Sequence, residues 1–324
     1  YMNDILKVSN SWSHDLSLSG GTKTTKYYVS LNYLNDDGIR IQSGYNRWSF
    51  NAKLNQKIGK KWTADLDLRY NQSMKSGSNY GIATSAFRFR PVDNPLGTDK
   101  PALLGQGDGN VDETYNPYET ITNAQSFSNN YKVRGTAGLS YNAFKGFTAR
   151  TELSMNKGFS KSKDWDNGGA TGAGYKVATL NRGESEGLRW SNTLNYTVQG
   201  LSKDHSINVI AGYEILTSNS EGSEIVGAGY PSGFTMDDAF GMINMTNVLK
   251  DWGKDSFSNT IDTPSNTISY FGRLNYSLKG RYLFTATFRA DGSSKFAPNN
   301  RWGYFAAGAL AWGIADEPWM MGSK

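Results

Sequence analysis

Cysteine is absent from the 324-residue chain, and proline and histidine are scarce, with 8 Pro and 2 His. Without cysteine there is no disulfide framework, no thiolate metal site and no cysteine nucleophile. The chain is nevertheless rich in aromatic residues, with 9 Trp, 19 Tyr and 15 Phe. Aromatic residues at this density bury enough surface to order a chain, which excludes a Pro-rich disordered or collagen-like protein. The composition therefore predicts a folded protein.

Long apolar runs and concentrated charge are also missing. No run approaches the roughly 20 apolar residues of a membrane helix, which excludes a helical membrane protein but leaves a membrane β-barrel open. The net charge of +5 is spread along the chain with no block of five like charges, which disfavours a nucleic-acid partner. Residues 1–5 do not resemble a signal peptide, so we expect either a mature or internal piece or a protein not exported by that route.

Apolar and polar residues alternate along most of the chain. In Tyr27–Tyr33 every second residue is apolar or aromatic, and Ser30 and Asn32 between them are polar, which is typical of a strand with one apolar face. No segment has a convincing helical period. We therefore predict an all-β, antiparallel, up-and-down arrangement of about eleven strands, joined in hairpins. The expected strands lie near residues 12–19, 27–33, 48–54, 62–70, 131–141, 147–155, 190–198, 207–215, 268–278, 282–290 and 304–312.

The connections between these strands alternate in length. Short turns are expected at 20–24, 59–61, 142–146, 200–204 and 279–281, and long loops at 73–129, 158–186 and 217–265. Loops this long are unusual in a compact soluble domain. In an up-and-down sheet every second connection lies at the same end, so all short turns share one end and all long loops the other. Outer-membrane barrels have this asymmetry, with short periplasmic turns and long extracellular loops.

Tyrosine and tryptophan stand at the ends of the apolar faces. Examples are Trp62 with Tyr70 and Trp302 with Trp312, with small or aliphatic residues between them. Two aromatic girdles flanking an apolar band are typical of a transmembrane barrel. The alternative is a soluble β-sandwich or solenoid, in which the same apolar face packs on a second sheet.

Two stretches resemble a known family. Residues 267–312, centred on Arg289–Ser294 and Asn299–Gly303, resemble the late barrel strands of SusC/RagA-type TonB-dependent outer-membrane transporters. Residues 14–39, with His14–Gly21 and Tyr27–Tyr33, look like an early barrel hairpin of the same family. The residues between these stretches match the family only in layout.

The resemblance implies a longer protein with parts that this sequence does not show. Such transporters have a signal peptide, a TonB-box, a plug inside a 22-stranded barrel and a SusD-like surface lipoprotein as a lid. We therefore expect residues 1–324 to be part of one barrel domain, without signal peptide, plug and remaining strands. The implied location is the cell outer membrane, and the implied partners are the lid, outer-membrane lipid and the TonB complex, reached through the missing N-terminal part.

Candidate catalytic residues are few. His14 and His205 are far apart, and there is no Gly-x-Ser-x-Gly elbow, P-loop or His-Glu-x-x-His motif. Asp164, Asp166 and Asp237–Asp238 place carboxylates in the long loops, where a glycosidase pair would fit, but solvated loop charge is the simpler interpretation. We predict no catalytic residues and no enzyme.

One loop segment has calcium-ligand spacing. Asp108, Asn110, Asp112 and Glu119 occupy positions 1, 3, 5 and 12 of an EF-hand-like loop. The sixth position is not Gly, and Pro117 interrupts the segment. A bound Ca²⁺ is therefore one interpretation, and an Asn/Asp-rich turn without metal is the other.

The long loops also carry aromatic residues among amides. An apolar ring beside hydrogen-bonding groups suits sugar rings or peptide side chains, and binding loops on a rigid scaffold are common. The alternative is that these rings pack the loops. The candidate ligand-binding residues are Tyr80, Phe87, Phe89, Tyr115, Tyr118, Trp165, Tyr230 and Trp252.

Polar residues that alternate with the apolar faces are expected to line a lumen or contact a plug. They are Asn51, Lys53, Asp65, Asp67, Arg69, Arg150, Glu152, Asn192, Asn208, Glu214, Arg273, Asn275 and Arg289. The resemblance then implies TonB-dependent import of a glycan or peptide oligomer across the outer membrane, without covalent chemistry. A soluble or surface-attached all-β glycan-binding module without transport is the alternative.

Overall fold

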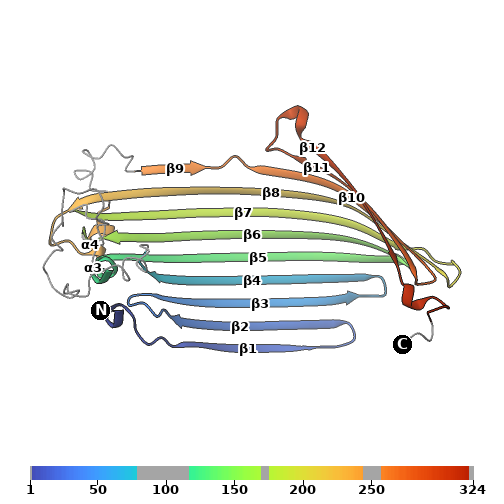
Figure 1. Ribbon diagram of the computed structural model, residues 1–324, viewed down its shortest axis with the longest axis horizontal. Helices are drawn as coiled ribbons and strands as arrows, with labels where there is room; N and C mark the ends of the chain where they lie inside the picture. Colours follow the sequence, from blue (N-terminus) through green and yellow to red (C-terminus); the bar gives the residue numbers. More distant parts are fainter. Residues whose placement is uncertain (1, 79–116, 169–174, 244–256, 321–324) are drawn as a thin grey trace.

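The computed structural model describes residues 2–78, 117–168, 175–243 and 257–320. In this part of the chain, twelve strands form a single antiparallel sheet (Figure 1). The sheet follows chain order from β1 to β8 and continues with β10, β11 and β12, while β9 pairs with β8. The strands are β1 (Ser11–Gly21), β2 (Thr25–Asp37), β3 (Gly44–Ile58), β4 (Trp62–Gly77), β5 (Ala124–Phe144), β6 (Phe147–Asp166), β7 (Lys176–Thr197), β8 (His205–Tyr230), β9 (Phe257–Ile261), β10 (Ser265–Leu278), β11 (Tyr282–Ser293) and β12 (Trp302–Trp312).

The up-and-down topology confirms the all-β prediction, and the predicted hairpins pair with each other in register. Tyr27 to Leu54 and Leu54 to Leu66, for example, are directly opposed residues on β2, β3 and β4. Opposed residues share a face of the sheet, so the period-two pattern of each strand adds to one continuous apolar face. The eleven expected strands are β1 to β8 and β10 to β12, and β9 is additional.

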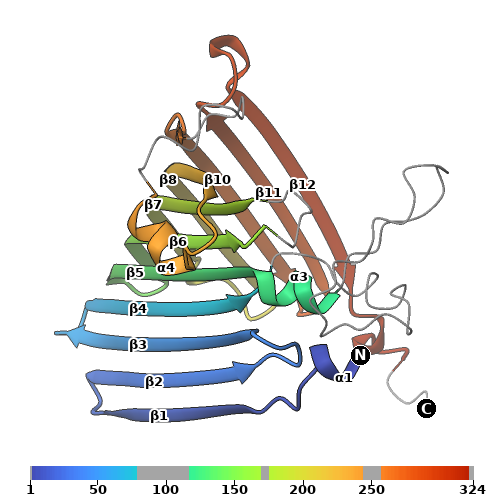
Figure 2. The ribbon, with the colours of Figure 1, turned by 90° about the vertical axis from the view of Figure 1, so that its left-hand side faces the viewer.

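The sheet is a single curved layer, and in Figure 2 the strands β10 to β12 run diagonally to the direction of β1 to β5. Its apolar side chains are largely exposed: Leu16 is 72% exposed, Met155 60% and Leu310 83%. No second sheet covers this face within the described residues, so the soluble sandwich is not what the chain forms. β1 pairs only with β2 and β12 only with β11 among these residues, which leaves the sheet open at both edges.

Aromatic rings form two rows on the apolar face. At the end with the long loops, which we call the long-loop end, Trp12, Tyr33 and Trp48 are in contact with ring centroids 5.1 and 4.3 Å apart. At the opposite, short-turn end, the rings of Trp62 and Tyr141 lie 4.4 Å apart. The predicted girdles are therefore present, with small and aliphatic side chains between them. Further contacting pairs are Trp190–Tyr213, Tyr213–Tyr270 and Tyr270–Trp302 in the first row, and Phe147–Tyr196 and Tyr282–Trp312 in the second.

The short turns depend on left-handed backbone. Lys279 and Gly280, between β10 and β11, have φ values of 53° and 69°. Two consecutive residues with positive φ match the twist of the flanking strands, and glycine adopts this conformation without strain. Gly146, between β5 and β6, has φ 87°, and a Cβ there would lie 2.3 Å from the carbonyl oxygen of Thr197. These turns hold neighbouring strands tightly together at one end.

The strands extend further at the long-loop end than predicted. β6 reaches Asp166 and β7 begins at Lys176, so most of the predicted loop 158–186 is strand. β8 likewise runs to Tyr230, and β5 begins at Ala124. The physical reason is that both faces become polar beyond the apolar band. The alternation therefore disappears from the sequence while the backbone ladder continues between neighbouring strands.

Short helices, which the sequence did not predict, occur at the long-loop end. They are α1 (Met2–Ile5), α3 (Pro117–Asn123) and α4 (Met236–Gly241). Of two 3₁₀ turns, η2 (Pro298–Asn300) also lies at the long-loop end, between β11 and β12, and η3 (Ile314–Asp316) follows β12 at the short-turn end. α4 begins with a capping box between Thr235 and Asp238. The hydrogen bonds from Thr235 hold the pKa of the Asp238 carboxyl below its usual value. None of the helices within the described ranges has the length and apolar character needed to cross a membrane.

Candidate functional site

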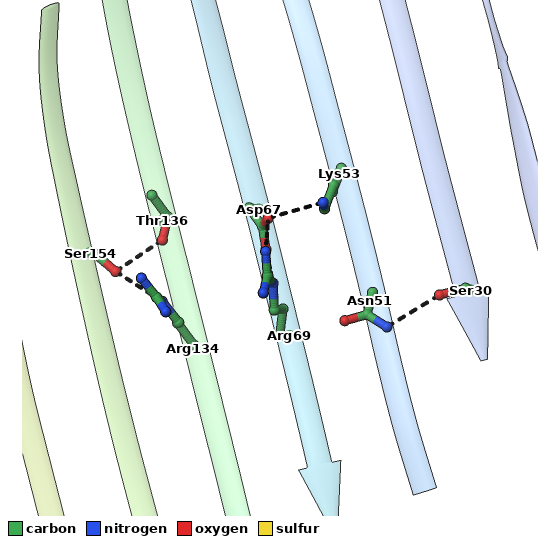
Figure 3. A network of polar contacts seen from close by, with 8 residues as sticks. All are labelled: Ser30, Asn51, Lys53, Asp67, Arg69, Arg134, Thr136 and Ser154. Atoms are coloured by element: carbon green, nitrogen blue, oxygen red, sulfur yellow. Dashed lines mark hydrogen bonds and ion pairs between the residues drawn. The ribbon is translucent and has the colours of Figure 1, made fainter. Parts of the chain in front are cut away.

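The face opposite the apolar one carries a network of polar side chains across β2 to β6 (Figure 3). Arg69 donates two hydrogen bonds of 2.8 Å to the Asp67 carboxylate, and Lys53 Nζ lies 3.8 Å from the same carboxylate. On β5 and β6, Arg134 Nε donates to Ser154 Oγ over 3.3 Å. We call this side of the sheet the polar face.

Arg150 connects strands that are not direct neighbours. Its Nη1 donates to Asp65 Oδ2 at 2.6 Å and its Nη2 to Glu152 Oε2 at 2.8 Å, although Asp65 lies on β4 and Arg150 on β6. On the intervening β5, Gly138 is the residue opposite both Asp65 and Glu152. A Cβ at Gly138 would lie 2.5 Å from Arg150 Nη2. The missing side chain of Gly138 therefore gives the guanidinium room to cross β5.

A second cluster lies on β7 to β11. Glu214 accepts from Arg189 Nε at 2.6 Å, and Arg289 Nη2 lies 4.0 Å from its other carboxylate oxygen. Arg289 also donates to both oxygens of Asp291, at 2.8 and 2.9 Å, and to Ser269 Oγ at 2.9 Å. Glu214 is the most shielded carboxylate of this cluster, with 16% of its side chain exposed. The charges on the polar face are therefore arranged in multiply hydrogen-bonded groups rather than as isolated pairs.

Several cations on the polar face, Arg134 and Arg273 among them, have no ion-pair partner within the described residues. Arg134 donates only to a serine hydroxyl, and no carboxylate lies within 4.0 Å of Arg273. An unpaired guanidinium binds carboxylates and phosphates by preference. The polar face can thus hold an anionic group.

The predicted polar residues lie on this face with one exception. Asn192 is opposite Thr151 on β6 and Tyr213 on β8, and the Tyr213 ring belongs to the aromatic row of the apolar face. The inward assignment of Asn192 was therefore wrong, because Trp190 and Leu194 on the same strand fix the side on which it lies. Arg134, Ser154 and Arg189 on the polar face were not singled out, although each alternates with apolar neighbours in the sequence.

Trp165 and Tyr230 lie at the long-loop end in a small core. Each is 7% exposed, their rings are 6.1 Å apart, and Ala178 and Ala239 complete the buried set. α4 and the residues that flank it bring Phe234, Met236, Phe240 and Ile243 against this core. Both aromatic residues thus pack β6, β7 and β8 against α4 and leave little ring surface for a ligand.

The other candidate ligand-binding residues are mostly not described. Tyr80, Phe87, Phe89, Tyr115 and Trp252 lie outside the described residues. Tyr118 is half-buried at the start of α3, and its carbonyl oxygen accepts from Thr122 Oγ1 at 2.9 Å. α3 contacts α1, where Ile121 and Ile5 are buried.

The calcium prediction also falls mainly outside the described part of the chain. Asp108, Asn110 and Asp112 are not described, and neither is the side chain of Glu119. Elsewhere in the described ranges, no three potential metal-ligating side chains come together. Two of the four carboxylates considered for a glycosidase have structural roles, since Asp166 is buried and accepts from Gly168 N, and Asp238 caps α4.

Comparisons with known proteins agree with this architecture. No protein-family model matches the chain. Over 340 residues, and 100% of its own length, the chain is 26% identical to TonB-dependent receptor P3 of Formosa agariphila. It is also 26% identical, over 98% of its length, to TonB-dependent receptor SusC of Bacteroides thetaiotaomicron. In both cases it spans only 32% of the relative, so the chain covers about a third of these proteins.

Solved structures share the fold. The structure of the RagAB peptide transporter superposes on 98% of the chain with a TM-score of 0.73 at 16% identity, and the chain covers 35% of it. The apolar face with two aromatic girdles is thus the lipid-facing side of an outer-membrane barrel wall, and the polar face is the lumenal side. The relatives are named as receptors and transporters, not as enzymes. In sequence, the chain is similar to TonB-dependent receptors, SusC among them, over about a third of their length, and in fold it matches the RagAB transporter.

Proposed function

We propose that the chain forms part of the barrel wall of a TonB-dependent importer that carries a glycan or peptide oligomer across the outer membrane. The observation that carries the proposal is the opposition of a lipid-facing apolar band and a charged lumenal face in one curved sheet. A barrel wall needs both faces, because one contacts hydrocarbon and the other encloses a polar interior. The soluble binding module does not account for the exposed girdles.

The lumenal charges are proposed to contact a plug contributed by the rest of the protein. Arg134 and Arg273 support this, because each has no ion-pair partner among the described residues and can receive a carboxylate. The hydrogen-bonded groups around Arg150 and Glu214 hold their neighbours in fixed positions. A plug on such a surface is bound by several weak contacts, which suits a part that must move during import.

The ligand is proposed to bind at the long-loop end. Tyr80, Phe87, Phe89, Tyr115, Tyr118 and Trp252 are the proposed contact residues, and Trp165 and Tyr230 are proposed to act by holding α4. Calcium binding by Asp108, Asn110, Asp112 and Glu119 would order the loop that contains Tyr115. Calorimetry of the full-length protein with Ca²⁺, compared with an Asp108→Asn/Asp112→Asn variant, tests the metal directly. Equal heats from both proteins would remove the metal site.

The proposed partners follow from the relatives. One relative is named SusC, and one structural neighbour is the RagAB peptide transporter. We therefore propose a SusD-like surface lipoprotein as the lid over the long-loop end and the TonB complex as the energy source. TonB would act through parts of the protein outside this chain.

Uptake by intact cells tests the function and separates the two substrate classes. The full-length gene is deleted, and uptake of fluorescent oligosaccharide and oligopeptide mixtures is measured in the deletion, the parent and a strain without active TonB. We expect one mixture to lose uptake in both the deletion and the TonB-deficient strain. Replacement of Tyr80, Phe87, Phe89 and Tyr115 by Ala in the full-length protein should reduce the same uptake, while Lys60→Gln in a short turn should not. Unchanged uptake of both mixtures in the deletion would contradict the proposal.

A further inference from the structure

On the lipid-facing side, the side chains become polar and cationic directly beyond the aromatic row at the long-loop end. Trp48 of this row is opposite Gln72, Gln72 is opposite Tyr131 on β5, and Tyr131 is opposite Phe159 on β6, so Tyr131 and Phe159 continue the row. Two residues further along the strands, Lys161 is opposite Asn129, and Asn129 is opposite Met74 on β4. Two residues of strand correspond to about 7 Å, so this second row lies at the height of lipid headgroups above the girdle.

A cavity of about 670 Å³ lies at this height over the outward side of β2 to β6. Its charged lining consists of Lys7, Lys75, Lys161 and Lys163, with Asp37 as the single carboxylate. Met74 and Phe127 line it as well, and each is 40% exposed. The cavity is therefore cationic at the outer end of an apolar surface.

Hydrogen-bonding groups in the cavity are unused within the described residues. The side-chain oxygens of Asn46 and Asn129 are buried without a partner. Asn129 donates through Nδ2 to the Tyr131 hydroxyl at 2.7 Å, which fixes the amide. Buried carbonyl oxygens without a donor are costly, and a ligand hydroxyl would satisfy them once the side chains turn these oxygens toward the cavity.

Lys161 and Lys163 differ in ion pairing from Lys157, which lies nearer the membrane on the same strand. Lys157 lies 3.6 and 4.0 Å from Glu184 and Glu186, so its charge is compensated by protein carboxylates. Lys161 has no such carboxylate in the described part of the chain, and Lys163 Nζ lies 4.8 Å from the Phe240 ring centroid. The two uncompensated ammonium groups thus stand side by side along β6 just above the membrane.

We propose that this cavity binds the headgroup of a phosphorylated glycolipid in the outer leaflet. The ammonium groups of Lys161 and Lys163 pair with phosphate, and the Asn46 and Asn129 oxygens accept from sugar hydroxyls. The acyl chains lie along β4 and β5, where Tyr70, Tyr131 and Val133 continue the apolar side below the cavity, and not along β6, where Lys157 pairs with Glu184 and Glu186. Charge complementarity and this continuity favour a lipid over a protein partner. The proposal rests on the outer-membrane location and not on the identity of the imported substrate.

Lipid retention by the full-length receptor tests the proposal. The protein is incorporated into phosphatidylethanolamine vesicles with or without bis-phosphorylated lipid A, extracted in mild detergent, and analysed for bound lipid by native mass spectrometry. Each surface lysine contributes about fivefold to binding of an anionic lipid, so Lys161→Gln/Lys163→Gln should lose most of the retained lipid A. Lys161→Arg/Lys163→Arg keeps the charges and should retain it.

A matched control lies at the opposite end of the barrel wall. Lys60→Gln/Lys61→Gln removes two lysines from the short turn between β3 and β4 and should leave lipid A retention unchanged. Equal retention by the wild type and the Lys161/Lys163 variant would overturn the proposal, as would equal loss in the control. Displacement of lipid A by millimolar inorganic phosphate would also overturn it, because the site would then bind free anions. A variant with normal import but lost lipid retention separates this proposal from the proposed function.

Discussion

The lumenal and lipid-facing sides of the same sheet are stabilised by different physical means. On the lumenal side, Arg150, Asp65 and Glu152 satisfy one another through charge-assisted hydrogen bonds. On the lipid-facing side, Leu153 and Met155 are exposed on the protein surface and do not pack in a protein core. Their favourable environment is hydrocarbon, which explains why so few apolar residues of this chain are buried. Within the membrane, the side of the sheet on which a residue lies therefore decides whether hydrogen bonds or hydrocarbon contact stabilise it.

The contrast between the two sides disappears at the long-loop end. Trp165 lies on the same side of β6 as Leu153, yet α4 and β7 bury it. Beyond the girdle there is no hydrocarbon, so an apolar side chain is stable only when protein covers it. The same side of one strand thus passes from lipid contact, through a cationic row, to a small conventional core.

Removal of the ring in this small core should give the largest effect. Trp165→Ala should lower the free energy of opening of the long-loop end by about 3–5 kcal/mol, because a large buried ring leaves a cavity. Hydrogen exchange of the α4 amides measures this opening. Phe159→Ala, on the same side of the same strand and 40% exposed, is the control and should change exchange much less. Equal effects would mean that the core does not hold α4.

A charge placed in the apolar band should be nearly as costly. Leu153→Arg should reduce the free energy of unfolding in phospholipid vesicles by about 2–4 kcal/mol, because arginine at mid-bilayer is poorly solvated. Ser191→Arg is the control, since Ser191 is opposite Glu152 and Glu214 on the lumenal side. Tryptophan fluorescence during urea unfolding of the full-length barrel measures both variants. The assignment of the two sides would be reversed if Ser191→Arg were the more damaging substitution.

Loss of the guanidinium that bridges β4 and β6 should have a smaller effect. Arg150→Met leaves the partly shielded carboxylates of Asp65 and Glu152 without their donor and should cost about 1–3 kcal/mol. Arg69→Met removes a more exposed arginine that pairs with Asp67 on its own strand, and should cost about 0–1 kcal/mol. The same urea unfolding distinguishes the two. An equal loss in both variants would show that the Arg150 hydrogen bonds across Gly138 contribute no extra free energy of unfolding.

The smallest effect concerns pH at the short-turn end. Glu317 is buried and accepts from Tyr282 Oη at 2.6 Å, Trp312 Nε1 at 3.0 Å and Arg281 Nη1 at 2.7 Å. These hydrogen bonds, with the Arg281 charge, hold the pKa of the Glu317 carboxyl below its usual value. A lowered pKa stabilises this corner above the usual glutamate pKa, and the stabilisation is lost as the pH falls through the folded-state pKa.

Hydrogen exchange at the C-terminal end of β12 measures this loss. Protection there should fall on acidification in the wild type and in the neighbouring Asp316→Asn variant. It should be lower at neutral pH and nearly independent of acid in Glu317→Gln. An unchanged acid response in Glu317→Gln would assign the pH dependence to another group.

The alternation of residues was sufficient to predict the strands inside the apolar band. Tyr27–Tyr33 and its equivalents are strands because hydrocarbon contact on one side requires an apolar residue at every second position. The extensions of β6, β7 and β8 were missed, since both of their sides face water or protein beyond the band. Asn192 was assigned to the wrong side although Trp190 and Leu194, two residues away on the same strand, already give its side by alternation. α4 had a capping signal in Thr235 and Asp238, but its packing partners lie on other strands.

The sequence by itself determined the fold class, the up-and-down order and the two girdles, because each follows from residues that are neighbours along one strand or one hairpin. Only the tertiary structure decided which charges meet, as with Arg150 and Asp65, which lie on separate strands and contact across the glycine of a third. It also decided that Trp165 and Tyr230 pack together and that the lysines of β6 line one cavity with the amides of β3 and β5. Such contacts depend on the register between strands, and register is fixed by the whole sheet rather than by any one segment.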